Sequence, residues 1–225
     1  MLVRRRAVTG LIAVVAAATA FTAVPSSAYA ETAAPVASTV SIELSPGTVE
    51  VFTGSATATA TVSAPGATPT GSIQFFVDGT SVGSGDLDAN GSVTINLGSF
   101  TTVGNVSVGA VYAGDGTVLG SDAQTSINVV KQHPTISVSS SPSVIKVHKT
   151  KPQVTVTLTG VGFTPTGPVT LSSGSSSWTA TLVGGSATFT LPGFKQPGDQ
   201  TLRVTYLGDG FAESATGSSV VTVVK

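Results

Sequence analysis

The sequence predicts an all-β protein built from two tandem antiparallel β-sandwiches. Three observations support this fold class. Val, Ile and Thr recur in alternation with polar residues, which is typical of half-buried strands. Apolar residues show almost no helical periodicity. Motifs that recur 94 or 96 positions apart divide the chain into two copies, and its 225 residues are enough for two domains of ordinary size.

Residues 1–30 are expected to form a secretory signal peptide. The basic start MLVRRR precedes the apolar run LIAVVAAATAFTAV and the small-x-small triplet Ala28-Tyr29-Ala30. We therefore expect cleavage after Ala30 and a mature protein that begins at Glu31. The chain has no cysteine for a lipid anchor or a disulfide, and no later apolar segment is long enough to span a bilayer. The expected location is extracellular, either free or held non-covalently on the cell wall.

Two constant offsets relate the copies. The Ser-Pro and Pro-Thr-Gly motifs keep an offset of 96, whereas every later anchor, including YAGDG at Tyr112 and YLGDG at Tyr206, keeps an offset of 94. Two residues are therefore missing from copy two between the equivalents of Gly71 and Gly91, which indicates a loop or an edge strand that tolerates length change. We place the first domain at 37–131 and the second at 132–225.

Alternation with a period of two predicts the strands of each copy in order. In copy one the expected inward-facing residues are Val40, Ile42 and Leu44; Ala56, Ala58, Ala60 and Val62; Ile73, Phe75 and Val77; Val93, Ile95 and Leu97; Val108, Ala110 and Tyr112; and Ile127 and Val129. In copy two they are Val154, Val156 and Leu158; Val169 and Leu171; Ala187, Phe189 and Leu191; and Leu202, Val204 and Tyr206. Six or seven short strands in about 95 residues are typical of a sandwich domain.

Three segments of copy one, GSIQFFVDGTSVGS, LDANGSVTINL and VGNVSVGAVYAGDG, resemble the bacterial immunoglobulin-like repeat domain of secreted and surface proteins. The resemblance covers nearly all of residues 37–225 and departs in copy two, where SSGSSSWTATL replaces the FFVDG stretch. It implies two immunoglobulin-like sandwiches and a role in surface display, spacing or adhesion. It also implies that Asp115 and Asp209 form tight turns with their flanking glycines and take no part in catalysis.

Reactive side chains are too few for an enzyme. The only histidines, His133 and His148, have no counterpart in the other copy, and the chain lacks a nucleophile elbow and a zinc-type histidine pair. We expect a non-catalytic protein with no catalytic residues and no cofactor.

One segment has the start of a calcium loop. Asp86, Asp88 and Asn90 precede Gly91, but the position of the terminal glutamate is Leu97 and copy two has no oxygen ligands there. The same residues fit a two-residue type I′ hairpin turn at Asn90-Gly91, which is the favoured interpretation over a weak metal site.

Trp178 is the only tryptophan, and alternation places it on the inward face. Core packing is favoured for this side chain, with stacking on a sugar ring as the alternative.

Charge differs sharply between the copies. Residues 31–131 carry one lysine against eight acidic residues, whereas residues 132–225 carry six basic residues against three acidic ones. The basic residues cluster in the turn KVHKTK, where the candidate polyanion contacts are Lys146, His148, Lys149 and Lys151. A solvated turn explains this cluster, and a contact with an anionic wall polymer, a glycan or another surface protein is the functional alternative. The net acidic mature chain does not suit nucleic acid.

The leading hypothesis for function is a non-catalytic secreted or cell-surface protein with a structural, spacer or adhesion role. The alternative is a module that binds a cell-wall polymer or carbohydrate. The two hypotheses differ in whether a surface of the molecule recognises a ligand.

Overall fold

The computed structural model describes residues 34–225, so the expected signal peptide lies outside the described residues. The described chain folds into sixteen strands joined by turns and loops. Within this part of the chain there is no helix of the length and apolarity needed to cross a membrane.

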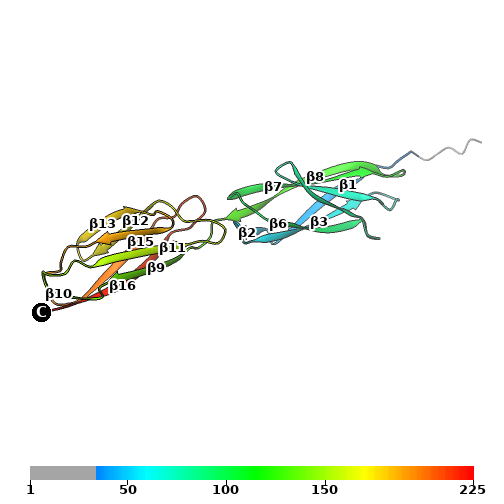
Figure 1. The fold of residues 1–225 in the computed structure, drawn as a ribbon. Helices are drawn as coiled ribbons and strands as arrows, with labels where there is room; N and C mark the ends of the chain where they lie inside the picture. The colour runs from blue at the N-terminus through cyan, green and yellow to red at the C-terminus, as the bar shows by residue number, and fades with distance from the viewer. Residues whose placement is uncertain (1–33) are drawn as a thin grey trace, which may run out of the picture. The chain divides into compact units, whose positions relative to one another are not determined.

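The first sandwich contains strands β1 to β8 (Figure 1). Its three-stranded sheet has the order β1 (Thr39–Ser45), β3 (Ser55–Ser63), β6 (Ser92–Ser99). Its five-stranded sheet has the order β2 (Thr48–Glu50), β8 (Leu119–Val130), β7 (Gly104–Gly114), β4 (Ser72–Val77), β5 (Thr80–Asp86).

The second sandwich repeats this topology strand for strand. Its three-stranded sheet has the order β9 (Thr135–Ser141), β11 (Gln153–Thr159), β14 (Ser186–Thr190). Its five-stranded sheet has the order β10 (Val144–Lys146), β16 (Ala215–Val224), β15 (Gly198–Tyr206), β12 (Pro168–Ser173), β13 (Ser176–Thr181). The predicted fold class, two antiparallel sandwiches, is confirmed.

The Ser-Pro motif marks the place where each copy changes sheets. In the first sandwich β1 pairs antiparallel with β3, whereas β2 pairs parallel with β8 in the other sheet. The second sandwich does the same, with β9 on β11 and β10 on β16. The peptide bonds Ser45-Pro46 and Ser141-Pro142 are both cis.

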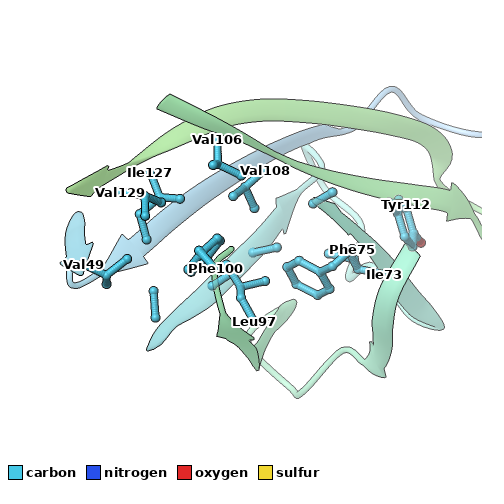
Figure 2. Packing of buried hydrophobic residues seen from close by; sticks show 14 of the residues in the cluster. Val49, Ile73, Phe75, Leu97, Phe100, Val106, Val108, Tyr112, Ile127 and Val129 are labelled. Carbon is cyan, nitrogen blue, oxygen red and sulfur yellow. The ribbon is translucent and has the colours of Figure 1, made fainter. Parts of the chain in front are cut away.

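The cores lie between the two sheets of each sandwich. Figure 2 shows side chains of the first core, with Phe75, Val108 and Ile127 from the five-stranded sheet and Leu97 from β6 of the three-stranded sheet. Apart from Trp178, every inward-facing residue predicted for copy two is buried, and Tyr206 has 0% exposure. In copy one the predicted residues of the edge strands β1 and β6 are buried less completely, because an edge strand has a neighbour on one side only. The partly buried members of the predicted set are Val40, Ile42 and Leu44 of β1, Val93 and Ile95 of β6, and Val77 at the end of β4.

The two missing residues of copy two lie on the edge strand and in the turn that follows it. In copy one the β4–β5 pairing shifts register, so that Phe75 faces Gly83 and Phe76 faces Ser81, which leaves Val82 as an extra residue. The β12–β13 pairing has no such shift. The second missing residue falls between β5 and β6, where copy one has five residues and copy two has four.

The predicted type I′ hairpin at Asn90-Gly91 is wrong. Strands β5 and β6 belong to different sheets, so the segment between them is a crossover. Gly91 has a φ of 72°, but Asn90 is not among the residues with positive φ, and both central residues of a type I′ turn require it. The type I′ geometry occurs in copy two, where Gly184 and Gly185 have φ angles of 57° and 75° between two mutual hydrogen bonds of Val183 and Ser186.

The segment between β8 and β9 contains Gln132. Among residues 34–225 it is the one polar residue that is buried, with 4% exposure. Its amide Nε2 donates to the carbonyl oxygens of Val51 and Val161, and its Oε1 accepts from the Val161 N–H at 3.1 Å. Three aromatic rings with centroids 5.0 to 5.8 Å apart lie beside these groups: Phe52, Phe163 and Phe211. A fully bonded amide is tolerated in a buried position because none of its polar atoms loses a partner.

Candidate functional site

The repeated Tyr-x-Gly-Asp-Gly motif is a structural clamp in both copies. Asp115 Oδ2 accepts hydrogen bonds from the N–H and hydroxyl of Thr70, at 2.9 and 2.8 Å. Its Oδ1 accepts from the N–H groups of Thr117 and Val118, each at 2.7 Å. One carboxylate therefore ties the Pro-Thr-Gly loop before β4 to the loop after β7. The same hydrogen bonds hold the pKa of Asp115 far below its usual value, because they favour the ionised form.

Asp209 repeats the clamp in the second sandwich. Its carboxylate accepts from the N–H and hydroxyl of Thr166, at 2.8 and 3.1 Å, and from the N–H groups of Phe211 and Ala212. Partial burial opposes ionisation of this group, but the hydrogen bonds from the backbone hold the pKa of Asp209 below its usual value. The aspartates are turn residues as expected, and their link to the Pro-Thr-Gly loop is an interaction that the sequence reasoning missed.

The tyrosines of the two motifs differ in the hydrogen bonds of their hydroxyl groups. Tyr112 donates its hydroxyl to the Thr70 carbonyl oxygen at 2.9 Å and lies 3.2 Å from Asp115 Oδ2. Tyr206 is equally buried, but its hydroxyl makes no hydrogen bond of good geometry. Burial, reinforced by the nearby Asp209 carboxylate, raises the pKa of Tyr206 to about 12. The Tyr206 hydroxyl thus lies close to the clamp without completing it.

The calcium-like segment uses its central carboxylate within the turn. Asp88 Oδ1 accepts from the N–H groups of Asn90 and Ser92, at 2.8 and 2.9 Å, and these bonds hold the pKa of Asp88 below its usual value. Within residues 34–225, no group of three or more His, Asp or Glu side chains is arranged to hold a metal ion. Asp86, the last residue of β5, is exposed, as are Asp88 and Asn90 in the crossover between the two sheets.

The predicted basic turn lies at one end of the second sandwich. Lys146, Lys149 and Lys151 are exposed, and the His148 backbone adopts a left-handed conformation with a φ of 58°. The His148 N–H donates to the carbonyl oxygen of Phe194 at 3.1 Å. Phe52 has the same left-handed conformation in the first sandwich, and its N–H donates to the carbonyl oxygen of Phe100. The geometry of this turn is therefore common to both copies, whereas the lysines occur only in copy two.

Two further lysines join this end, and sequence proximity could not reveal them. Lys195 follows Phe194, and Lys225 follows Val224, whose carbonyl oxygen accepts a hydrogen bond from the Val147 N–H at 3.0 Å. We define the basic end as Lys146, His148, Lys149, Lys151, Lys195 and Lys225, all of them exposed. Five of the six basic residues counted in copy two therefore gather in one place. The sequence showed the surplus of positive charge and its cluster in KVHKTK, but not that Lys195 and Lys225 join this cluster.

Two of the three acidic residues of copy two lie away from the basic end, and one lies at it. Asp209 and Glu213 lie at the opposite end of the β15–β16 pair, beside the segment that contains Gln132. Asp199, exposed at the start of β15, lies at the basic end and accepts a hydrogen bond from the Thr222 hydroxyl at 2.7 Å. The five lysines of this end therefore face one carboxylate, and a surplus of positive charge remains. His133 lies in the segment between β8 and β9, away from His148, so the structure does not bring the two histidines together.

Trp178 lies on the edge strand β13 and faces inward as predicted, but it is only partly buried. Its ring packs against the second core and lines a groove of about 370 Å³ with Phe194, Lys195 and Gln200. Trp178 therefore contacts the core, as favoured from the sequence, and leaves part of its ring open to solvent.

The fold and these surfaces define a tandem β-sandwich protein of immunoglobulin-like type. Residues 42–130 match the family model of the bacterial Ig-like domain (group 3), which confirms the predicted resemblance for the first sandwich.

Solved structures with similar folds come from varied sources. A 1.5-MDa bacterial ice-binding adhesin aligns with 16% identity and a TM-score of 0.38 over 84% of this chain, which spans 65% of the adhesin structure. A segment of two fibronectin type III domains from chicken tenascin aligns with 15% identity and a TM-score of 0.45, over 81% of this chain and 97% of that one. The D1–D4 ectodomain fragment of ICAM-5 aligns with 18% identity and a TM-score of 0.44, over 82% of this chain and 53% of that one. Comparison with curated proteins gave no match.

Proposed function

We propose that this is a non-catalytic extracellular protein that uses its tandem sandwiches as a structural spacer and its basic end to adhere to an anionic polymer of the cell surface. The observation that carries the adhesive part is the gathering of five lysines at one end of the second sandwich. The match of the first sandwich to the bacterial Ig-like family model supports a structural or surface role.

Charge asymmetry gives the basic end its selectivity. Exposed ammonium groups attract a polyanion over about 10 Å at 0.1 M salt, but over only about 3 Å at 1 M salt. The first sandwich, with one lysine against eight acidic residues in 31–131, repels the same polymer. A polyanion therefore binds one end of the second sandwich and leaves the first sandwich free.

The Tyr-x-Gly-Asp-Gly motif, which is repeated in both copies, supports a structural role over a catalytic one. The carboxylate oxygens of Asp115 and Asp209 accept hydrogen bonds from backbone and threonine groups of their own sandwiches. A carboxylate bound in this way has a low pKa and is a poor general base at neutral pH.

Retention of the mature protein on isolated cell walls tests the proposal. We expect binding at low salt that is released at high salt and by replacement of Lys146, Lys149 and Lys151 with glutamine. Lys195→Gln should weaken retention, whereas Arg203→Gln, which removes an exposed charge from the middle of β15, should not. Retention that survives both high salt and the triple substitution would overturn the proposed adhesion through the basic end.

A further inference from the structure

We propose that the groove beside Trp178 binds an acidic polysaccharide, with a sugar ring against the indole and the anionic groups of the polymer on the lysines of the basic end. This inference rests on the proposed function, because it names the chemistry of the polyanion and adds a site that recognises its sugar.

The groove lies where the two sheets of a sandwich meet at an open edge. β13 ends the five-stranded sheet and β14 ends the three-stranded sheet, and the loop after β14 supplies Phe194 and Lys195. The first sandwich has a groove in the same place, around Phe100, the equivalent of Phe194. The fold therefore forms this edge groove twice, and only the side chains that line it differ.

The two grooves differ in size and in charge. The first has a volume of about 150 Å³ and is lined by Asp78 and by apolar residues that include Val82 and Val106. The second has about 370 Å³ and contains Lys195 and Gln200, the latter in the place of Val106. Only the second falls in the range of roughly 300 to 1,000 Å³ that is usual for small-ligand sites.

Strand register explains how the indole reaches this place. In the first sandwich Phe75 pairs with Gly83, and a Cβ on Gly83 would lie 3.8 Å from the Ile95 side chain. In the second sandwich the equivalent pair is Leu171 and Trp178. The indole thus occupies a position that copy one fills with a glycine, on the inward side of an edge strand. A large aromatic ring at an open edge is held by the core on one side and meets solvent on the other.

The lining fits an acidic sugar better than either a neutral sugar or a simple polyanion. The apolar face of a pyranose packs on an aromatic ring, and Gln200, Ser173 and Ser176 supply polar groups for hydroxyls. Lys195 lines the groove, and the loop that carries it is hydrogen-bonded to the basic turn through Phe194 and His148. A chain of acidic sugars therefore meets an aromatic surface and ammonium groups together.

The only tryptophan of the protein reports directly on this groove. We would titrate the mature protein at low salt with oligogalacturonate, with the same oligomer as its neutral methyl ester, and with inorganic polyphosphate, and follow Trp178 fluorescence and binding heat. We expect oligogalacturonate to change the fluorescence and to bind about tenfold or more tightly than the methyl ester, because the ester lacks the charge that the lysines attract.

Substitutions separate the indole from the charge. Trp178→Leu keeps apolar volume at the edge and should weaken oligogalacturonate binding about tenfold, the loss expected for one aromatic contact. Trp178→Phe should retain part of it, and Val82→Ala, at the first groove, should have no effect. Urea unfolding followed by circular dichroism verifies that each variant is folded.

The outcomes distinguish this inference from the proposed function. Equal binding of polyphosphate and oligogalacturonate, with unchanged affinity in Trp178→Leu, would overturn the groove while leaving charge-driven adhesion in place. Equal binding of the methyl ester would overturn the role of the lysines in the groove. Loss of all binding in the triple lysine variant together with a tenfold loss in Trp178→Leu would support both.

Discussion

Replacement of Tyr206 by phenylalanine should stabilise the second sandwich or leave it unchanged, whereas the same change at Tyr112 should destabilise the first. The Tyr206 hydroxyl is buried without a hydrogen bond of good geometry, and burying an unpaired polar group costs about 1 to 3 kcal/mol. Its removal should therefore return up to about 1 kcal/mol after relaxation of the site. Tyr112→Phe loses the bond to the Thr70 carbonyl and should cost about 0.5 to 1.5 kcal/mol.

Tyr206→Ala sets the scale for the comparison. The ring has 0% exposure in the second core, and truncation of a large buried aromatic residue costs about 3 to 5 kcal/mol. This loss is a large share of the roughly 5 to 15 kcal/mol by which a typical domain is stable. The ring, and not its hydroxyl, is thus expected to supply the stability at this position.

Urea unfolding followed by Trp178 fluorescence measures the Tyr206 variants, because the only tryptophan belongs to the second sandwich. Amide exchange of β7 peptides in the same full-length protein measures Tyr112→Phe. A loss of more than about 1 kcal/mol in Tyr206→Phe would refute the reasoning, since it would show that the hydroxyl is hydrogen-bonded to the Asp209 clamp in solution.

Three further predictions concern the clamp, the segment between the sandwiches and maturation. Asp209→Ala should cost about 1 to 3 kcal/mol in urea unfolding, because four hydrogen bonds are lost. The folded pKa of Asp209 is lowered, so its contribution to stability is present above the unfolded pKa near 3.9 and is lost as the pH falls further; Asp209→Ala should flatten this acid dependence, and an unchanged slope would contradict it. Gln132→Leu should increase amide exchange at Val161, which loses the Oε1 acceptor, and unaltered exchange would argue against that bond. N-terminal sequencing of the extracellular protein should find Glu31 first, and retention of residues 1–30 would exclude the expected cleavage.

The sequence predicted the fold because each strand buries one face. Alternation such as Val154, Val156 and Leu158 is a local signal, and all three residues are buried. The internal repeat added a second, independent signal, because the offset changed between Gly71 and Gly91 and the structure places the missing residues on the edge strand and in the adjoining turn.

The turn between β5 and β6 shows where local reasoning failed. Asn90-Gly91 has the composition of a hairpin turn, but whether two consecutive strands pair with each other depends on which sheet each one joins. That choice is made by contacts far apart in the sequence. For the same reason the local motif around Asp115 gave no indication that its carboxylate binds Thr70, 45 residues earlier.

The sequence by itself predicted the fold class, the offsets of the internal repeat, the positions of most core residues and the surplus of positive charge in copy two. Only the tertiary structure decided that Lys195 and Lys225 join the turn of Lys146, and that Trp178 is both held by the core and open to a groove. The physical reason is that burial along a strand has a period of two residues and can be seen in any short segment. The meeting of loops at the end of a sandwich is set instead by how the sheets pair and pack, and no single segment encodes it.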